Sequence, residues 1–135
     1  MKVLVLPLIL SSIAVLNVIG NGKHSSQCCI HPNYQIIHEV NVSEWDFDCD
    51  EPVQIKCNNI NFAADLVGIA GRRSYKENFK VFTRNPKQCV RNLTCAPFQG
   101  IWTEPRKWIP EGRTDGFFNF ACAFKKNGKW QFFED

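Results

Sequence analysis

Hydrophobic and polar residues along the chain follow mostly the two-residue period of β-strands. The alternation is clean in residues 53–57 and looser in residues 34–42, and residues 79–82 form a further short apolar run. A period of two is typical of strands that bury one face. The pattern therefore predicts a mainly β domain.

Two segments interrupt this pattern. Residues 62–70 are the single candidate helix, with Asn61 placed to cap its start and Gly71 placed to end it. Residues 96–116 hold three Pro and three Gly. Because these residues interrupt regular elements, we expect an ordered but irregular loop there.

The C-terminal segment predicts a β-hairpin, because Asn127-Gly128 is a strong turn signal after the alternating residues 118–124. A two-residue loop would pair Phe124 with Gln131, whereas a three-residue loop would pair Phe124 with Trp130. The second register places the large apolar residues on one face, and a buried face normally sets the register. We therefore predict one buried face that consists of Phe120, Cys122, Phe124, Trp130 and Phe132.

The N-terminus has the pattern of a secretory signal peptide. A basic start at Lys2 precedes the apolar residues 3–19, and small residues follow at positions 20–22. This run falls short of the roughly 20 apolar residues that span a bilayer. We therefore expect residues 1–22 to be cleaved and residues 23–135 to form one secreted, extracellular domain. An uncleaved membrane anchor is the alternative.

Two Asn-x-Ser/Thr sequences agree with export, because they would carry glycans on the surface of a secreted protein. They begin at Asn41 and Asn92, which are the predicted glycosylation sites. Export also places the chain in an oxidising compartment, where cysteines form disulfides.

The chain has seven cysteines, so six can pair and one is left over. The candidate disulfide residues are Cys28, Cys29, Cys49, Cys57, Cys89, Cys95 and Cys122. Adjacent cysteines seldom bond to each other, and we predict that Cys28 or Cys29 is the unpaired thiol, free to form a disulfide-linked homodimer. Cysteines and strand pattern together predict a small disulfide-stabilised β-sandwich-like domain with one short helix.

A metal site is the alternative use of the first cysteines, which lie between His24 and His31. Zinc fingers space paired ligands two to four residues apart, whereas these thiols are adjacent and belong to an exported chain. We therefore predict no metal site and no cofactor.

Charge is unevenly distributed, although the formal net charge is only +3. Residues 39–51 hold six acidic residues and no Lys or Arg, and residues 72–91 hold seven basic residues and one acidic residue. A basic stripe attracts sulfated glycans or anionic lipid head groups. It can equally face the acidic stretch within the fold or keep the protein soluble. We expect no nucleic-acid partner, since the chain is exported, and no membrane partner.

From Cys89 onward the sequence reads Cys-Val-Arg-Asn-Leu-Thr-Cys, followed later by Phe-Asn-Phe-Ala-Cys and Asn-Gly-Lys-Trp. This pattern resembles the nematode six-cysteine secreted domain family over the C-terminal third of the chain. The matching positions are Cys89, Leu93, Cys95, Cys122, Gly128, Lys129 and Trp130. The chain differs in having seven cysteines that begin with an adjacent pair. The resemblance implies a secreted β-rich module and no particular biochemical activity.

The residues give no pattern for catalysis. All three His, at positions 24, 31 and 38, precede the main β segments, and no Ser lies in a Gly-x-Ser-x-Gly context. Asp46 and Asp48 would share a face of an extended segment, which keeps a small hydrolase as an alternative. A solvated acidic face is the simpler interpretation. We therefore predict that the protein is not an enzyme and has no catalytic residues.

Aromatic residues concentrate near the C-terminus and predict both core and binding surface. Phe and Trp bury the most area per residue, so the C-terminal Phe residues are expected in the core. Trp102 and Trp108 belong instead to the Pro/Gly loop. There we predict an exposed binding surface that includes Arg106 and Lys107, with residues 97–112 contacting the partner.

The sequence thus predicts a secreted, non-catalytic binding protein that acts through protein–protein contacts at a cell surface or in extracellular matrix. The expected partner is an extracellular protein or a cell-surface receptor. One alternative is a host-defence or toxin-like effector that acts on membranes or anionic glycans. The other is the small secreted hydrolase.

Overall fold

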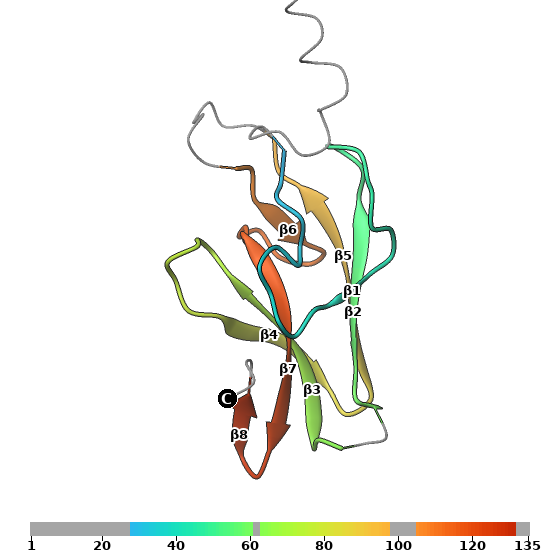
Figure 1. Cartoon of the computed structure of the whole chain (residues 1–135), viewed down its shortest axis with the longest axis vertical. Coiled ribbons are helices and arrows are strands. Elements are labelled where there is room, and N and C mark those ends of the chain that lie inside the picture. Colours follow the sequence, from blue (N-terminus) through green and yellow to red (C-terminus); the bar gives the residue numbers. More distant parts are fainter. Residues whose placement is uncertain (1–27, 61–62, 98–104, 132–135) are drawn as a thin grey trace, which may run out of the picture.

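The computed structural model describes residues 28–60, 63–97 and 105–131, which form two antiparallel four-stranded sheets (Figure 1). The first sheet, in the order β1-β2-β5-β6, consists of β1 (Asn41–Val42), β2 (Val53–Asn58), β5 (Gln88–Cys95) and β6 (Trp108–Pro110). The second sheet, in the order β4-β3-β7-β8, consists of β4 (Lys80–Asn85), β3 (Leu66–Arg72), β7 (Asn119–Lys126) and β8 (Lys129–Gln131). The predicted mainly β, disulfide-stabilised sandwich is confirmed.

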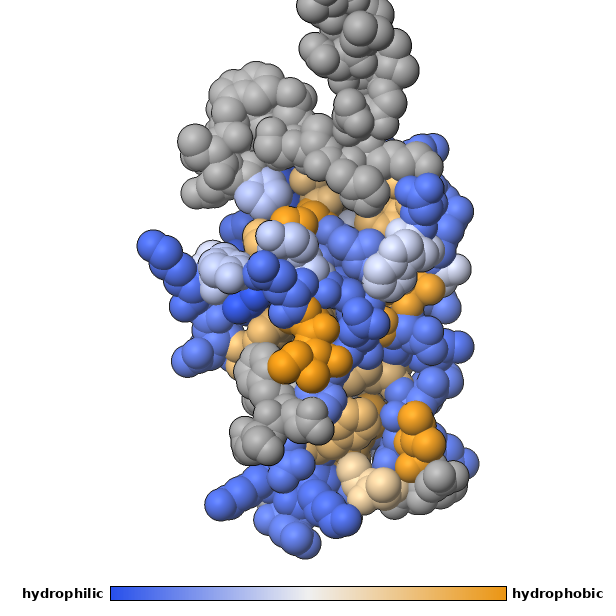
Figure 2. Space-filling model, viewed as in Figure 1, coloured by the Kyte–Doolittle hydropathy of each residue, from blue (hydrophilic) through white to orange (hydrophobic). Residues whose placement is uncertain are grey.

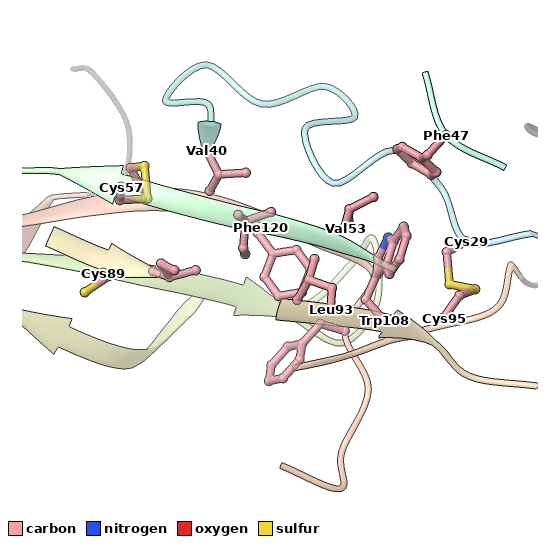
Figure 3. Close-up of a cluster of buried hydrophobic side chains, with 14 of the residues drawn as sticks. Cys29, Val40, Phe47, Val53, Cys57, Cys89, Leu93, Cys95, Trp108 and Phe120 are labelled. Carbon is pink, nitrogen blue, oxygen red and sulfur yellow. A yellow bond between two sulfur atoms is a disulfide. The ribbon is translucent and has the colours of Figure 1, made fainter. Parts of the chain in front are cut away.

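The main core lies between the two sheets and is built from alternate residues of their central strands. Ile55 of β2 and Leu93 of β5 share one fully buried cluster with Val67, Ile69 and Phe120 of the second sheet. Leu93 and Phe120 are labelled in Figure 3. Full burial of such a side chain contributes about 1.5–3 kcal/mol. The alternating pattern that predicted β2 therefore reflects a strand with one face in the core.

Three disulfides cross-link the chain: Cys28–Cys49, Cys29–Cys95 and Cys57–Cys122. The remaining cysteine, Cys89, is a buried free thiol. The prediction that Cys28 or Cys29 is unpaired is therefore wrong. Side chains of consecutive residues in extended backbone point to opposite sides, so each of the two reaches a different partner. Cys28 and Cys29 therefore do not supply a free thiol for the predicted disulfide-linked homodimer, and the homodimer itself stays a prediction.

Residues 66–72 form β3, so the helix predicted over residues 62–70 is wrong. β3 lies between β4 and β7 and is buried along most of its length. On the outer face of the sheet, Ala70 belongs to a second apolar cluster with Phe79. A strand covered on both faces gives a continuous apolar run in place of alternation, which is why its sequence was misread.

The segment predicted as an irregular loop over residues 96–116 contains strand β6, so that prediction is wrong at residues 108–110. β6 pairs with β5 through Leu93 and Pro110, and it lies at the edge of its sheet. Proline lacks a donor for the ladder and is tolerated in an edge strand. The tertiary pairing therefore overrides the local loop signal.

The strand predicted over residues 34–42 is confirmed only at Asn41–Val42, since turns and bends occupy the preceding residues. Those turns pair instead with one edge of β7. The Phe120 amide donates to the Pro32 carbonyl at 2.9 Å, and the Cys122 amide donates to the His38 carbonyl at 3.0 Å. The N-terminal segment thus protects the edge of β7 that the short β8 leaves open.

The predicted register of the closing hairpin is wrong. Lys125 pairs with Trp130 across a two-residue turn, in which Asn127 and Gly128 have φ of 53° and 82°. Positive φ at both positions is the turn type whose twist matches the flanking strands. The one-face assumption failed because β7 is buried on both faces. Trp130 packs on the outer cluster, where a Cβ on Gly68 would lie 3.1 Å from its ring.

The predicted signal peptide, residues 1–22, and Phe132 of the predicted hairpin face lie outside the described residues. In the described part of the chain, no helix is long and apolar enough to cross a membrane. Both glycosylation sequences fall within it, and the side chains of Asn41 and Asn92 are exposed.

Candidate functional site

A groove of about 410 Å³ opens between the two sheets, beside the start of β1. Its walls are residues 37–41 on one side and residues 56–58 of β2 with Ile60 on the other, and Cys122 and Phe124 of β7 complete its lining. In Figure 2, which has the same view as Figure 1, hydrophobic residues reach the surface in the region of β7 and β2. We call this the isoleucine groove.

Two aliphatic side chains at the rim are unusually exposed. Ile37 has 66% and Ile60 has 69% of its surface accessible to solvent. Between them, the half-buried Phe124 and the buried Cys57–Cys122 disulfide form an apolar floor. Exposed aliphatic side chains around a hollow with a mixed polar and apolar lining are a feature of recognition sites.

The buried Asn33 holds the wall that carries Ile37 in place. Its side-chain amide donates to the Val40 carbonyl at 2.8 Å, and its side-chain oxygen accepts from the Val40 amide at 2.7 Å. This pair of hydrogen bonds closes residues 33–40 into a loop, and the bond from Cys122 to the His38 carbonyl fastens that loop to β7. The rim of the groove is therefore preorganised, which lowers the cost of ordering on binding.

Polar groups surround this apolar floor. Glu39 is exposed on one wall and Lys56 is half-buried on the other, so the groove presents both signs of charge. The His38 ring meets the Phe124 ring edge-on, with centroids 6.2 Å apart. An apolar centre with a mixed polar rim suits an apolar side chain carried by a polar chain segment.

The structure does not assemble the predicted binding surface. Trp102 lies outside the described residues, and Trp108 is fully buried. The Trp108 indole donates to the Ile30 carbonyl at 2.7 Å, and its ring packs against Phe47 with centroids 5.6 Å apart. The predicted exposure of Trp108 is wrong, because its flat ring fills the end of the core while its one polar atom finds a partner.

Arg106 is also part of the framework, with only 10% of its side chain exposed. Its guanidinium donates to the Cys95 carbonyl at 3.3 Å and pairs with Asp50 at 2.7 Å. It therefore braces the end of β5 next to the disulfides, and it neutralises one of the acids in the stretch of residues 39–51. Lys107 is half-buried.

A second hollow of about 300 Å³ lies over β3 and β4 and is lined by Arg72, Arg73, Lys80, Arg113 and Phe117 among others. We call it the arginine groove. Its three arginines stack on aromatic rings. The Arg113 guanidinium carbon lies 5.5 Å from the Phe117 ring centroid, and that of Arg73 lies 5.6 Å from the same centroid.

Arg72 is the most integrated of these arginines. Its guanidinium donates to the buried Asn119 side-chain oxygen at 2.8 Å and lies 4.8 Å from the Phe79 ring centroid and 4.9 Å from that of Tyr75. Burial lowers the pKa of Arg72, and Tyr75 partly opposes that effect. These contacts link β3, β7 and the turn before β4, so this charge supports the fold.

Asp115 is the shared counterion of the other two arginines. It accepts from Arg73 at 2.7 Å and from Arg113 at 2.8 Å. The Arg113 hydrogen bond, with smaller help from the charges of both arginines, lowers the pKa of Asp115 to about 2. The same bond raises the pKa of Arg113. The arginine groove thus carries its own counterion.

No group of three His, Cys, Asp or Glu side chains comes close enough to hold a metal ion in the ranges that the structure describes. Cys28 and Cys29, the thiols of the alternative zinc site, are both bonded in disulfides. Their thiolates are therefore not free to act as ligands.

Sequence reasoning missed the isoleucine groove, although two local signals pointed to it. Ile36 and Ile37 are adjacent, and two consecutive apolar residues cannot both face one core from extended backbone. Ile60 is flanked by three asparagines within residues 58–61. Asparagine favours turns, and a turn at the surface would leave an apolar side chain exposed.

We compared the chain with protein-family models, with curated proteins and with solved structures, and no match was found in any of the three. The resemblance to the nematode six-cysteine domain therefore stays a prediction, and the groove is interpreted from its own residues.

Proposed function

We propose that the protein is a secreted, non-catalytic binding module whose isoleucine groove receives an apolar side chain of a partner protein. One observation carries the proposal: Ile37 and Ile60 are about two-thirds exposed and both line a groove that also contains Phe124 and the Cys57–Cys122 disulfide. Removing such a side chain from water contributes about 1.5–3 kcal/mol. Binding would gain this free energy, because folding leaves most of the surface of both side chains in water.

The three disulfides support an extracellular setting, since such bonds persist where conditions are oxidising. The partner is then an extracellular protein or a cell-surface receptor. Glu39 and Lys56 flank the apolar floor, so a partner segment with an apolar residue between a basic and an acidic residue would complement the groove in shape and charge.

Glycosylation bears directly on this site. Asn41 begins one of the two Asn-x-Ser/Thr sequences and also lines the groove. A glycan on Asn41 would therefore lie at the groove itself and should weaken binding there. The side-chain amide of Asn92, in the second sequence, donates to Glu111 at 3.1 Å, and Asn92 does not line the groove.

A matched set of variants tests the proposal. The full chain, secreted with an affinity tag, is cross-linked to cell surfaces and extracellular fluid, and captured proteins are quantified against Ile37→Glu, Ile60→Glu and Tyr75→Glu. Tyr75 is 55% exposed, lies near the arginine groove and receives the same change of charge, which makes it the control. We expect both isoleucine variants to lose at least about tenfold of the specific partner signal, with the control unchanged.

The proposal fails if the captured set is identical for all four proteins while their melting temperatures agree. It also fails if only Tyr75→Glu loses the signal, because the contact would then lie over the arginine groove.

The effector acting on anionic glycans or membranes is the second candidate, and one observation favours it. Lys80 and Arg84 are exposed on β4, an edge strand next to the arginine groove. Charged residues on an edge strand also prevent unwanted strand pairing. Retention on a sulfated-glycan column, or leakage of anionic vesicles, that falls for Lys80→Glu and not for Ile37→Glu would favour this candidate.

A further inference from the structure

Three cysteines gather beneath the isoleucine groove. Cys57 on β2 and Cys122 on β7 form the disulfide that joins the two sheets, and the free Cys89 on β5 belongs to the same buried cluster. Figure 3 shows the Cys57 disulfide and the Cys89 thiol on neighbouring strands. A thiol beside a disulfide is the minimum requirement for thiol–disulfide exchange.

Cys89 lies directly opposite Cys57 in the β2–β5 ladder. The Asn59 amide donates to the Lys87 carbonyl at 2.9 Å, one step along the same ladder. By the alternation of antiparallel strands, Cys57 and Cys89 are therefore also a hydrogen-bonded pair, whose Cα atoms are about 5.5 Å apart. Disulfides span Cα separations of about 4.4–6.8 Å, and the existing Cys57–Cys122 bond spans 5.6 Å. The Cα separation of Cys57 from either partner thus lies within the range of a disulfide.

The Cys89 thiol also points toward the strand next to Cys122. It donates to the Val67 carbonyl of β3 at 3.3 Å, and Ile69, two residues along β3, pairs with Cys122 in the β3–β7 ladder. The Thr83 side chain and the backbone at Ile69 also form hydrogen bonds with the thiol. Hydrogen bonds of a thiol are weak, so rotation about the χ1 torsion of Cys89 would turn its sulfur toward that of Cys57.

We propose that Cys89 exchanges with the Cys57–Cys122 disulfide, forming a Cys57–Cys89 bond and releasing Cys122 as a thiol. The Cys89 thiol gives up its proton, and the resulting thiolate attacks the Cys57 Sγ atom. The bond between the Cys57 and Cys122 sulfurs breaks, and Cys122 leaves as a thiolate that takes up a proton. One S–S bond forms and one breaks, so the step needs no oxidant or reductant.

This exchange would change the isoleucine groove. The covalent link between the sheets is replaced by one within the first sheet, so the walls formed by β2 and β7 are no longer tied. Cys122 lines the groove, and its thiol would face any molecule bound there. The inference holds whether or not the groove binds a protein, because it rests on the three cysteines alone.

The environment of Cys89 keeps this step slow at neutral pH. Burial raises the pKa of Cys89, and the Thr83 hydroxyl on β4, the Arg91 charge on its own strand and the backbone at Ile69 on β3 oppose that effect only in part. Because the thiolate is the attacking species, the rate should rise about tenfold per pH unit below that pKa.

Trapping of free thiols tests the exchange in the full chain. The oxidised protein is held at pH 6, 7 and 8 without added thiol or oxidant, alkylated after an acid quench under denaturing conditions, and digested with trypsin without reduction. Residues 57–72, 88–91 and 114–125 are separate tryptic peptides, so each of the three cysteines is identified by its own mass. We expect the label to move from Cys89 to Cys122, with a linked 57–72/88–91 product, about ten times faster for each pH unit.

One control variant and two wild-type outcomes decide the test. In Cys89→Ala no free thiol should be labelled at any pH, and Cys57–Cys122 should persist. In wild-type protein, label that stays on Cys89 alone after prolonged incubation at pH 8 overturns the proposal. Label spread also over Cys28, Cys29, Cys49 and Cys95 overturns it as well, because it would show general scrambling of an unfolded chain.

Discussion

The isoleucine groove and the arginine groove use their side chains in opposite ways. In the arginine groove, Arg72 is bonded to Asn119 and surrounded by rings, while Arg73 and Arg113 share the carboxylate of Asp115. In the isoleucine groove, the side chains that stand out are aliphatic and project into water. Two arginines of the charged surface thus share one internal counterion, whereas Ile37 and Ile60 remain mostly in water.

This difference separates a structural cluster from a recognition site. A charge that already has a counterion gains little from a second one and must first be freed from its partner. An exposed aliphatic side chain, by contrast, gains from any apolar contact that removes water. For this protein, unused apolar surface is therefore a better guide to binding than local charge density.

The largest expected effect concerns the floors of the two grooves. Phe117, beneath the arginine groove, is 3% exposed and stacks on Phe82 with ring centroids 5.2 Å apart. Phe117→Ala should lower the free energy of unfolding by about 3–5 kcal/mol. Phe124→Ala, in the half-buried floor of the isoleucine groove, should cost about half as much. Urea denaturation measures both, and equal losses would erase the distinction.

Arg72 should give the next largest effect. Arg72→Ala removes a stacked guanidinium and leaves the fully buried Asn119 oxygen without this donor. We expect a loss of about 1–3 kcal/mol in unfolding free energy. Lys56→Ala, on the wall of the isoleucine groove, is the comparison and should change stability by less than about 0.5 kcal/mol. A negligible effect of Arg72→Ala would mean that this arginine is available to a ligand after all.

Asp115 offers a pH test of the internal counterion. Its pKa of about 2 in the folded protein lies below the ordinary aspartate value near 3.9 in the unfolded chain. Its contribution is therefore complete above about pH 4 and is lost as pH falls through about 2. Asp115→Asn should cost about 0.2–1 kcal/mol at pH 7, and the difference from wild type should be mostly lost at pH 2, where the folded carboxyl is half protonated. Thermal melts at pH 7, 4 and 2 measure this, and a pH-independent difference would exclude the ionic mechanism.

The smallest effect on stability is expected at Ile37 and Ile60. Serine at either position should alter the unfolding free energy by less than about 0.5 kcal/mol, because both side chains are mostly in water already. A loss above 1 kcal/mol in thermal or urea unfolding would show that these residues support the fold, and would remove the contrast with the arginine groove.

The sequence predicted strands correctly where one strand face is buried and the other is exposed to solvent. Val53–Cys57 alternates and forms β2, and the Asn-Gly dipeptide forms the turn of the closing hairpin. It misled where both faces are covered, as in β3, whose nearly continuous apolar run was interpreted as a helix between Asn61 and Gly71. The preference for placing Trp130 beside Phe124 failed for the same reason, since β7 has a second buried face to receive it.

The candidate site was much less predictable. Trp108 and Arg106 looked like surface residues because they stand among prolines and glycines, yet both are held by segments far away in sequence, at Ile30 and Asp50. No sequence pattern identified Ile37 or Ile60 as candidates, because a pattern along the chain does not show which apolar residues stay outside the core.

By itself, the sequence determined that this chain is a mainly β domain with an odd number of cysteines, because alternation and composition are local properties. Only the tertiary structure decided which cysteine stays free, which face each hairpin residue occupies and where apolar surface remains exposed. The physical reason is that all three depend on contacts between distant segments. Cys57 lies opposite Cys89 and is bonded to Cys122 only because two sheets, assembled from alternating parts of the chain, meet at that point.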